Sequence, residues 1–95
     1  MIDVFTEKWP NHEVVILLIP KTCSCIVYNY PLEQESFIST VYTQPDFRNK
    51  GHMSTLLDVA EVYCRYPISV SVANDAPKYV IDMYRKRNYN IIKEE

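Results

Sequence analysis

The residues with the clearest chemistry lie at 48–52, where the sequence reads Arg48, Asn49, Lys50, Gly51 and His52. Apolar residues at helical spacing follow directly. The first turn of a helix has N–H groups without backbone partners and a partial positive charge, so it attracts anions. The basic side chains add charge at the same place, and the glycine lets a ligand approach the main chain. The segment is a candidate anion site; the alternative is a solvated basic turn whose glycine only accommodates a positive φ.

The elements on either side of this segment differ in their periodicity. Before it, runs rich in β-branched and aromatic residues alternate with turns that contain proline, and short connections favour antiparallel pairing. We expect strands over Glu13–Ile19, Cys23–Tyr30 and Ser36–Thr43, and a further short edge strand over 4–9. The expected strands lead directly to the candidate anion site.

After the site, the apolar residues recur at helical spacing from Met53 to Cys64, and Pro67 stops that helix. Asn74 to Pro77 is typical of a helix start, with a capping side chain before a proline. We expect a strand over 68–73, a helix over 79–87 and a last strand over 89–93. The order βββ-α-β-α-β predicts an α+β fold, a mostly antiparallel sheet with two main helices.

Length and composition exclude several classes of protein. The chain has 95 residues and 11.2 kDa, with 47% hydrophobic and 23% charged residues, which is typical of one small folded domain over 1–95. Gly51 is the only glycine, whereas average usage would give roughly seven. This excludes a glycine-rich dinucleotide binder, a collagen-like chain and a flexible linker. We expect this glycine where a side chain cannot go.

The charge is distributed unevenly along the chain. The net charge is −2, so the whole protein lacks the basic footprint of a nucleic-acid binder. Residues 1–47 have two basic and six acidic side chains, a net charge of −4, whereas residues 48–95 have eight and six, a net charge of +2. An anionic ligand is therefore expected on the second half. A nucleic-acid binder that uses this half and its tyrosines is a weaker hypothesis.

The cysteines indicate a reducing compartment. Cys23 and Cys25 share one face of an expected strand, Cys64 falls on the expected helix, and three is an odd number. Without a secretory signal, this predicts free thiols in the cytoplasm. Spacing between the cysteines and histidines matches no known zinc site, so we expect no metal. The longest apolar run, Val14 to Ile19, is too short to span a bilayer, so no membrane partner is expected.

Two segments resemble a known family. Residues 41–57 resemble the acetyl-CoA signature of the GNAT N-acetyltransferase superfamily: a strand, a proline, an aromatic residue, Arg/Gln-x-x-Gly-x-Gly/Ala, and then a helix with paired leucines. Residues 79–89 are similar to the C-terminal helix of the family, which ends in Leu-Tyr-x-Lys-x-Gly-Phe. The resemblance covers roughly residues 36–93. It implies an acetyl-CoA-dependent transfer of an acetyl group to an amine, in which an oxyanion forms and a thiolate leaves.

The resemblance also implies residue roles. Val41 and Thr43 would offer main-chain groups to the pantetheine arm, and Tyr84 would protonate the departing thiolate. Glu35 lies near the start of the strand on which some members carry a general base. The pyrophosphate loop would consist of Arg48, Asn49, Lys50, Gly51, His52, Met53 and Ser54.

Simpler interpretations of these residues remain. Glu35 would equally be a solvated carboxylate at a strand edge, and Tyr84 a core aromatic residue. Cys64 on the apolar stripe of a helix predicts an inert buried thiol rather than a nucleophile. The basic residues of the last helix would form a solvated face or meet an acidic partner: Lys78, Arg85, Lys86 and Arg87.

The sequence departs from the family pattern in three places. Met53 replaces a preferred Gly or Ala, so its side chain must swing away from the phosphates. Asn88 replaces a Gly, which asparagine allows because it tolerates positive φ. The space before Glu13 cannot hold the two helices that usually wall the acceptor site. This predicts an open site suited to a protein lysine or N-terminus, or alternatively a non-catalytic interaction module that binds a protein partner through a sheet edge or the last helix.

Overall fold

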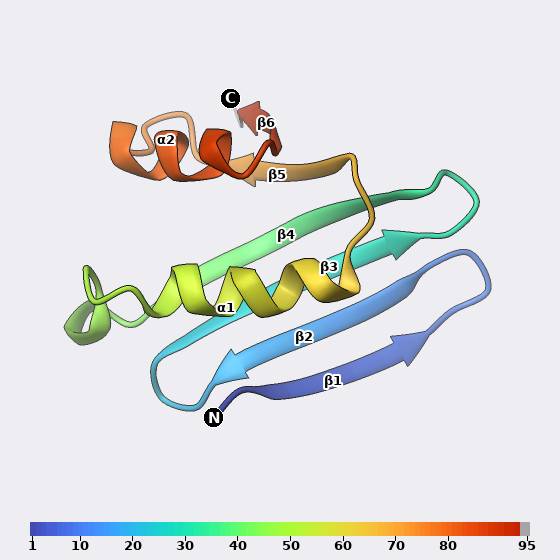
Figure 1. The fold of residues 1–95 in the computed structure, drawn as a ribbon, viewed down its shortest axis with the longest axis horizontal. Coiled ribbons are helices and arrows are strands. Elements are labelled where there is room, and N and C mark those ends of the chain that lie inside the picture. Colours follow the sequence, from blue (N-terminus) through green and yellow to red (C-terminus); the bar gives the residue numbers. More distant parts are fainter. Residues whose placement is uncertain (94–95) are drawn as a thin grey trace.

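The computed structural model describes residues 1–93 as one six-stranded mixed sheet with two α-helices on one of its faces (Figure 1). The strands are β1 (Asp3–Lys8), β2 (Glu13–Ile19), β3 (Cys23–Tyr30), β4 (Glu35–Thr43), β5 (Ile68–Val72) and β6 (Asn90–Lys93). The helices are α1 (His52–Ala60) and α2 (Lys78–Lys86), and the short 3₁₀ turns are η1 (Pro45–Phe47) and η2 (Glu61–Tyr63). Within residues 1–93, no helix is long and apolar enough to cross a membrane.

The order of the strands in the sheet follows the order of the chain, from β1 to β6. β1 to β4 form an antiparallel meander, as the short connections predict, and the expected edge strand near the N-terminus is confirmed. β4, β5 and β6 pair in parallel because α1 and α2 connect them. Right-handed crossovers that advance in one direction place both helices on the same face. The opposite face of the sheet receives neither helix (Figure 1).

The core lies between the sheet and α1. Every second residue of β3 is buried, which is the period expected for a strand with one covered face. The shared core contains Val15, Leu17, Cys25, Val27 and Ile38 from the sheet, and Leu56, Leu57 and Ala60 from α1. Cys23 and Cys25 share this face, as predicted, and both thiols are free. Burial raises the pKa of the Cys25 thiol to about 12, so it stays protonated.

β4 and β5 pair over only three positions. The partners are Ser36 with Ile68, Phe37 with Ser69, and Ile38 with Val70. Directly afterwards β4 contains one extra residue relative to β3, because Val27 pairs with Ile38 but Ile26 pairs with Thr40. Such a bulge bends the strand that contains it. Beyond the bulge, the edge of β4 toward β5 has no strand partner among the described residues.

Two predicted helix boundaries are wrong. The first helix does not continue to Cys64: α1 ends at Ala60, η2 follows, and Cys64 has an extended backbone with ψ of 161°. A short 3₁₀ turn is a frequent end of an α-helix, and Pro67 disfavours a helical conformation at Tyr66, so the helix does not resume. The second helix receives no cap from Asn74. It begins at Lys78 with Pro77 before it and without any side-chain cap, because residues 73–76 form a separate backbone turn.

The predicted solvated position of Arg87 is also wrong. Its side chain is only 15% exposed, and its guanidinium donates hydrogen bonds to Asp58 at 2.9 Å and Glu61 at 2.7 Å. A third hydrogen bond, 3.0 Å long, goes to the Ser54 carbonyl in α1. The Tyr89 hydroxyl donates to the same Glu61 carboxylate. These bonds connect the C-terminal end of α2 to α1, and they add to the strand pairing and the core contacts that join β1–β4 to β5–β6.

Removing this link should lower stability. Arg87→Leu leaves the Asp58 and Glu61 carboxylates without their cation, so we expect a loss of about 1–3 kcal/mol in the free energy of unfolding, measured in urea. Arg85→Leu is the matched control, because Arg85 is exposed on the same helix, and it should change the value by no more than about 0.5 kcal/mol. Equal effects of the two substitutions would contradict the assigned role of Arg87.

Candidate functional site

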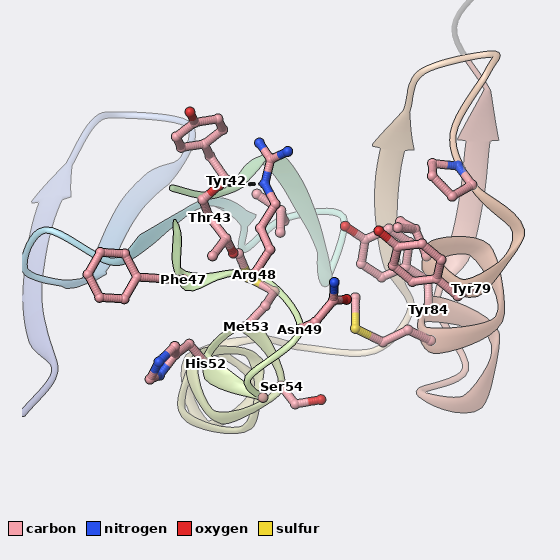
Figure 2. A pocket seen from close by; sticks show the side chains of 15 residues that line it. Tyr42, Thr43, Phe47, Arg48, Asn49, His52, Met53, Ser54, Tyr79 and Tyr84 are labelled. Carbon is pink, nitrogen blue, oxygen red and sulfur yellow. Dashed lines mark hydrogen bonds between the residues drawn. The ribbon is translucent and has the colours of Figure 1, made fainter. Parts of the chain in front are cut away.

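A pocket of about 430 Å³ opens where β4 ends, between the 47–54 segment and α2 (Figure 2). Eight of the nine residues predicted to bind a cofactor line it, namely Val41, Thr43, Arg48, Asn49, Gly51, His52, Met53 and Ser54. Tyr84 lines the opposite wall from α2. The divergence of β4 from β5 creates this space, because a fully paired sheet would close it.

The β4 wall holds Arg48 in place. Its Nε donates a 3.0 Å hydrogen bond to the Thr43 carbonyl, and its guanidinium carbon lies 5.8 Å from the centre of the Tyr42 ring. No carboxylate of the described residues pairs with Arg48. The pocket lining contains no Asp or Glu. The positive charge of Arg48 is therefore uncompensated beside the pocket, which favours an anionic ligand.

The N-terminus of α1 forms the floor of the site. Gly51 has φ of 79° and ψ of 4°, and no side chain caps the helix. The first intrahelical bond runs from the Thr55 N–H to the Gly51 carbonyl at 3.1 Å. No described residue accepts a hydrogen bond from the N–H groups of residues 52–54. They are left for a ligand, which is the arrangement that binds phosphates.

The glycine is required for its backbone angle rather than for space. A Cβ atom at Gly51 would meet nothing within 4 Å, so the expectation that no side chain could fit there is wrong. The positive φ is the strained feature for any other residue, and it is this turn that directs the chain into α1. Asn88, the predicted substitute for glycine after α2, also has a positive φ of 62°. The open space at Gly51 keeps the helix N-terminus accessible.

Two of the predicted basic groups lie at the margin. Lys50 does not line the pocket; its ammonium lies 5.8 Å from the centre of the Phe47 ring. The His52 ring meets Phe47 edge-on at 6.2 Å between centroids and points away from α2 (Figure 2). Met53, which stands where the family prefers a small residue, packs against the hydrophobic core. Its side chain is thereby half-buried, as predicted for a residue that must leave the helix N-terminus free.

Tyr84 is a core residue whose hydroxyl faces the pocket. It is 4% exposed and its ring stacks on Tyr89, with centroids 5.9 Å apart, so it is a core aromatic residue. Its hydroxyl points toward the pocket beside that of Tyr79 (Figure 2) and has no hydrogen-bond partner within residues 1–93. Burial, with a smaller contribution from the Cys25 thiol, raises the pKa of Tyr84 to about 12. The hydroxyl is therefore protonated at neutral pH and able to donate a proton; its role as the acid stays a prediction.

Glu35 lies away from the other candidates. It is exposed at the first residue of β4, four residues before the bulge, which is about 13 Å along an extended strand. It does not line the pocket, and its role as a base stays a prediction. Cys64 is half-buried, and burial raises the pKa of its thiol to about 11, so it is a poor nucleophile.

Part of the α2 wall was not predicted as a site from the sequence. Tyr79 and Met83 line the pocket together with Val80 and Tyr84. Tyr79 and Met83 are four positions apart, as are Val80 and Tyr84, and residues at this spacing share one helix face. This spacing is visible in the sequence and could have identified the wall.

The fold and the pocket define an α+β domain whose diverging parallel strands and uncapped helix N-terminus form an open candidate site for an anion. The sequence model of the Acetyltransferase (GNAT) family matches residues 2–89, nearly the whole chain, and the protein belongs to that family. The predicted family and the predicted α+β class are thereby confirmed. No curated protein matches the chain.

The raised pKa of Tyr84 predicts how stability depends on alkaline pH. The folded value is about 12, and the unfolded value is about 10. Folding therefore favours the neutral phenol, and this contribution is complete below pH 10 and is lost as the pH rises to 12. Between pH 10 and pH 12, the free energy of unfolding should fall by about 1–2 kcal/mol less in Tyr84→Phe than in the wild type.

The measurement is urea unfolding at several alkaline pH values. Tyr63→Phe is the control, because Tyr63 is an exposed tyrosine outside the pocket, and it should follow the wild type. Parallel pH dependence of Tyr84→Phe and wild type would contradict the buried, protonated state of Tyr84.

Proposed function

We propose that the pocket binds acetyl-CoA and that the protein transfers its acetyl group to an amine. The observation that carries the proposal is the uncapped N-terminus of α1, which opens onto a pocket lined by Arg48 and by no carboxylate. Membership of the GNAT acetyltransferase family supports an acyl-CoA ligand.

The residues present fit the parts of this ligand. The N–H groups of residues 52–54 and the Arg48 guanidinium would hold the diphosphate, because both are without an anionic partner in the described chain. The unpaired edge of β4 near Val41 would hold the pantetheine arm, whose amides require main-chain partners. The carbonyl of Thr43 already accepts from Arg48, so Thr43 would act chiefly by fixing that guanidinium.

The proposed chemistry requires one proton donor and one proton acceptor. Bound acetyl-CoA supplies an activated carbonyl and a sulfur leaving group. Tyr84 is protonated and faces the pocket, so it is the proposed donor to the sulfur. An amine arrives mostly as an ammonium and must lose a proton first. Glu35 is the proposed acceptor, and because it lies outside the pocket lining, the proton would reach it through solvent.

We propose a protein lysine or N-terminus as the acceptor. Both helices lie on one face of the sheet, and no described element covers the other face, so the acceptor side is open. An open side favours a group presented by a macromolecule over an enclosed metabolite. Incubation with acetyl-CoA and lysate proteins, followed by mass spectrometry, should detect new acetyl groups on these amines.

Ligand binding is tested at Gly51. A ligand at about 100 times its Kd adds about 2.7 kcal/mol, so saturating acetyl-CoA should raise the Tm of the wild type by on the order of 10 °C. Gly51→Glu places a carboxylate before the free N–H groups and should abolish this shift. Gly51→Gln has the same backbone strain without the charge and should keep part of it. A wild type without any shift at millimolar acetyl-CoA would refute the proposed binding.

Catalysis is tested at Tyr84. The Tyr84 hydroxyl has no hydrogen-bond partner within residues 1–93, so Tyr84→Phe should leave the acetyl-CoA shift in Tm intact. It should lower kcat by about 10²–10⁴-fold, the usual contribution of a general acid. Tyr63→Phe should have wild-type kcat. Binding of acetyl-CoA without acetylation of any amine by the wild type would favour a non-catalytic interaction module instead.

A further inference from the structure

The face of the sheet opposite the helices is apolar and uncovered. Strand alternation places Phe5, Ile16 and Tyr42 on this face, and they are 56%, 36% and 45% exposed. Ile26 and Tyr28 lie between them on β3 and are half-buried. Neither helix lies on this face (Figure 1), and the loop residues that contact these side chains are His12, beside Tyr28, and Arg48, beside Tyr42. A contiguous exposed apolar surface of this kind marks an interaction site.

All charged side chains that the strands themselves place on this face are acidic, and the Arg48 guanidinium reaches it only at Tyr42, at the end of β4. Asp3, Glu7 and Glu35 occupy the same alternate positions as the apolar residues. The strands of the described chain contain two basic residues, Lys8 and Lys93, and the register places both on the helix-covered face. A partner for this face is therefore expected to be apolar and positively charged.

A pocket of about 320 Å³ lies on this face near the β1–β2 turn. Aromatic rings form much of its wall: Trp9 stacks on His12 with 2° between the planes, and Tyr28 tilts against His12 at 5.8 Å. Glu7 is the only acidic or basic side chain in the lining besides His12. Ring faces beside one carboxylate are the chemistry that binds an ammonium or guanidinium group.

We propose that this face docks an amphipathic protein segment that carries lysine or arginine. One cationic side chain would enter the pocket between Trp9 and Glu7, while apolar side chains of the segment would cover Phe5 and Ile16. A second copy of this chain fits poorly, because its carboxylates would face those of the first copy. The pocket lined by Trp9 and Glu7 lies at the opposite end of the sheet from the pocket at the end of β4, and the uncovered face reaches the latter only at Tyr42. The proposal therefore does not depend on acetyl transfer.

Trp9 is the only tryptophan, so its fluorescence reports on this pocket directly. The probe is a synthetic peptide with leucines on one helical face and lysines on the other. We expect a saturable change in emission that weakens as salt is added. The matched peptide, with glutamine in place of every lysine, should bind about tenfold more weakly. Equal affinity for the two peptides, or no saturable change with either, would overturn the proposal.

Variants locate the binding surface. Glu7→Gln should weaken binding of the lysine peptide several-fold, and Phe5→Ser should weaken binding of both peptides. Glu33→Gln is the matched control, because Glu33 lies in the exposed turn between β3 and β4, and its affinity should equal that of the wild type. Circular dichroism and urea unfolding verify folding. A Glu33→Gln effect as large as that of Glu7→Gln would overturn the proposed position.

Sedimentation separates this partner from self-association. The proposal expects a monomer that binds the lysine peptide. A stable dimer that excludes the peptide and dissociates in Phe5→Ser would assign the face to a second copy of the chain and overturn the proposal. Loss of acetyl-CoA binding has no bearing on this outcome, since the pocket lined by Trp9 and Glu7 shares no lining residue with the pocket at the end of β4.

Discussion

The structure depends on the point at which β4 stops pairing with β5. A parallel pair of this length would normally continue to the ends of its strands, but the bulge after Ile38 bends β4 away after three positions. The pocket opens where β4 and β5 no longer form hydrogen bonds, and other contacts must compensate for the missing bonds. Arg87 supplies these contacts, because its guanidinium joins α2 to the carboxylates and to a carbonyl of α1. The pocket and the need for the Arg87 link therefore both follow from the early end of the pairing between β4 and β5.

The position of α1 follows from the same divergence. The chain leaves β4, passes through η1 and turns at Gly51 with a positive φ, so the N-terminus of the helix faces the opening. Most helices satisfy their first N–H groups with a capping side chain. α1 has none, and Met53 is withdrawn into the core instead of covering that end. α1 therefore lacks the stability that a cap would contribute, but its first N–H groups stay accessible beside Arg48, which has no carboxylate partner among the described residues.

The sequence predicts the strands well because alternation is a local property: β2 and β3 begin and end at the predicted residues. It predicts the pocket wall at 48–54 because helix start, glycine and basic residues are contiguous. It fails for Arg87, whose partners Asp58 and Glu61 are 29 and 26 residues away, and a run of basic residues on a helix resembles a solvated face. The bulge and the uncovered face also escape prediction, since both depend on the register between strands.

The Arg87 link has a consequence for local opening. β5, α2 and β6 are held to the remaining chain by three paired positions, by the Arg87 hydrogen bonds and by core residues such as Ile81 and Tyr84. We expect this C-terminal unit to open more readily than the β1–β4 meander. The two walls of the pocket belong to different units, because Val41 lies on β4 and Tyr84 lies on α2. A ligand that touches both walls is lost when the unit opens. We therefore expect a bound ligand to slow amide hydrogen exchange throughout the C-terminal unit, including residues far from the ligand.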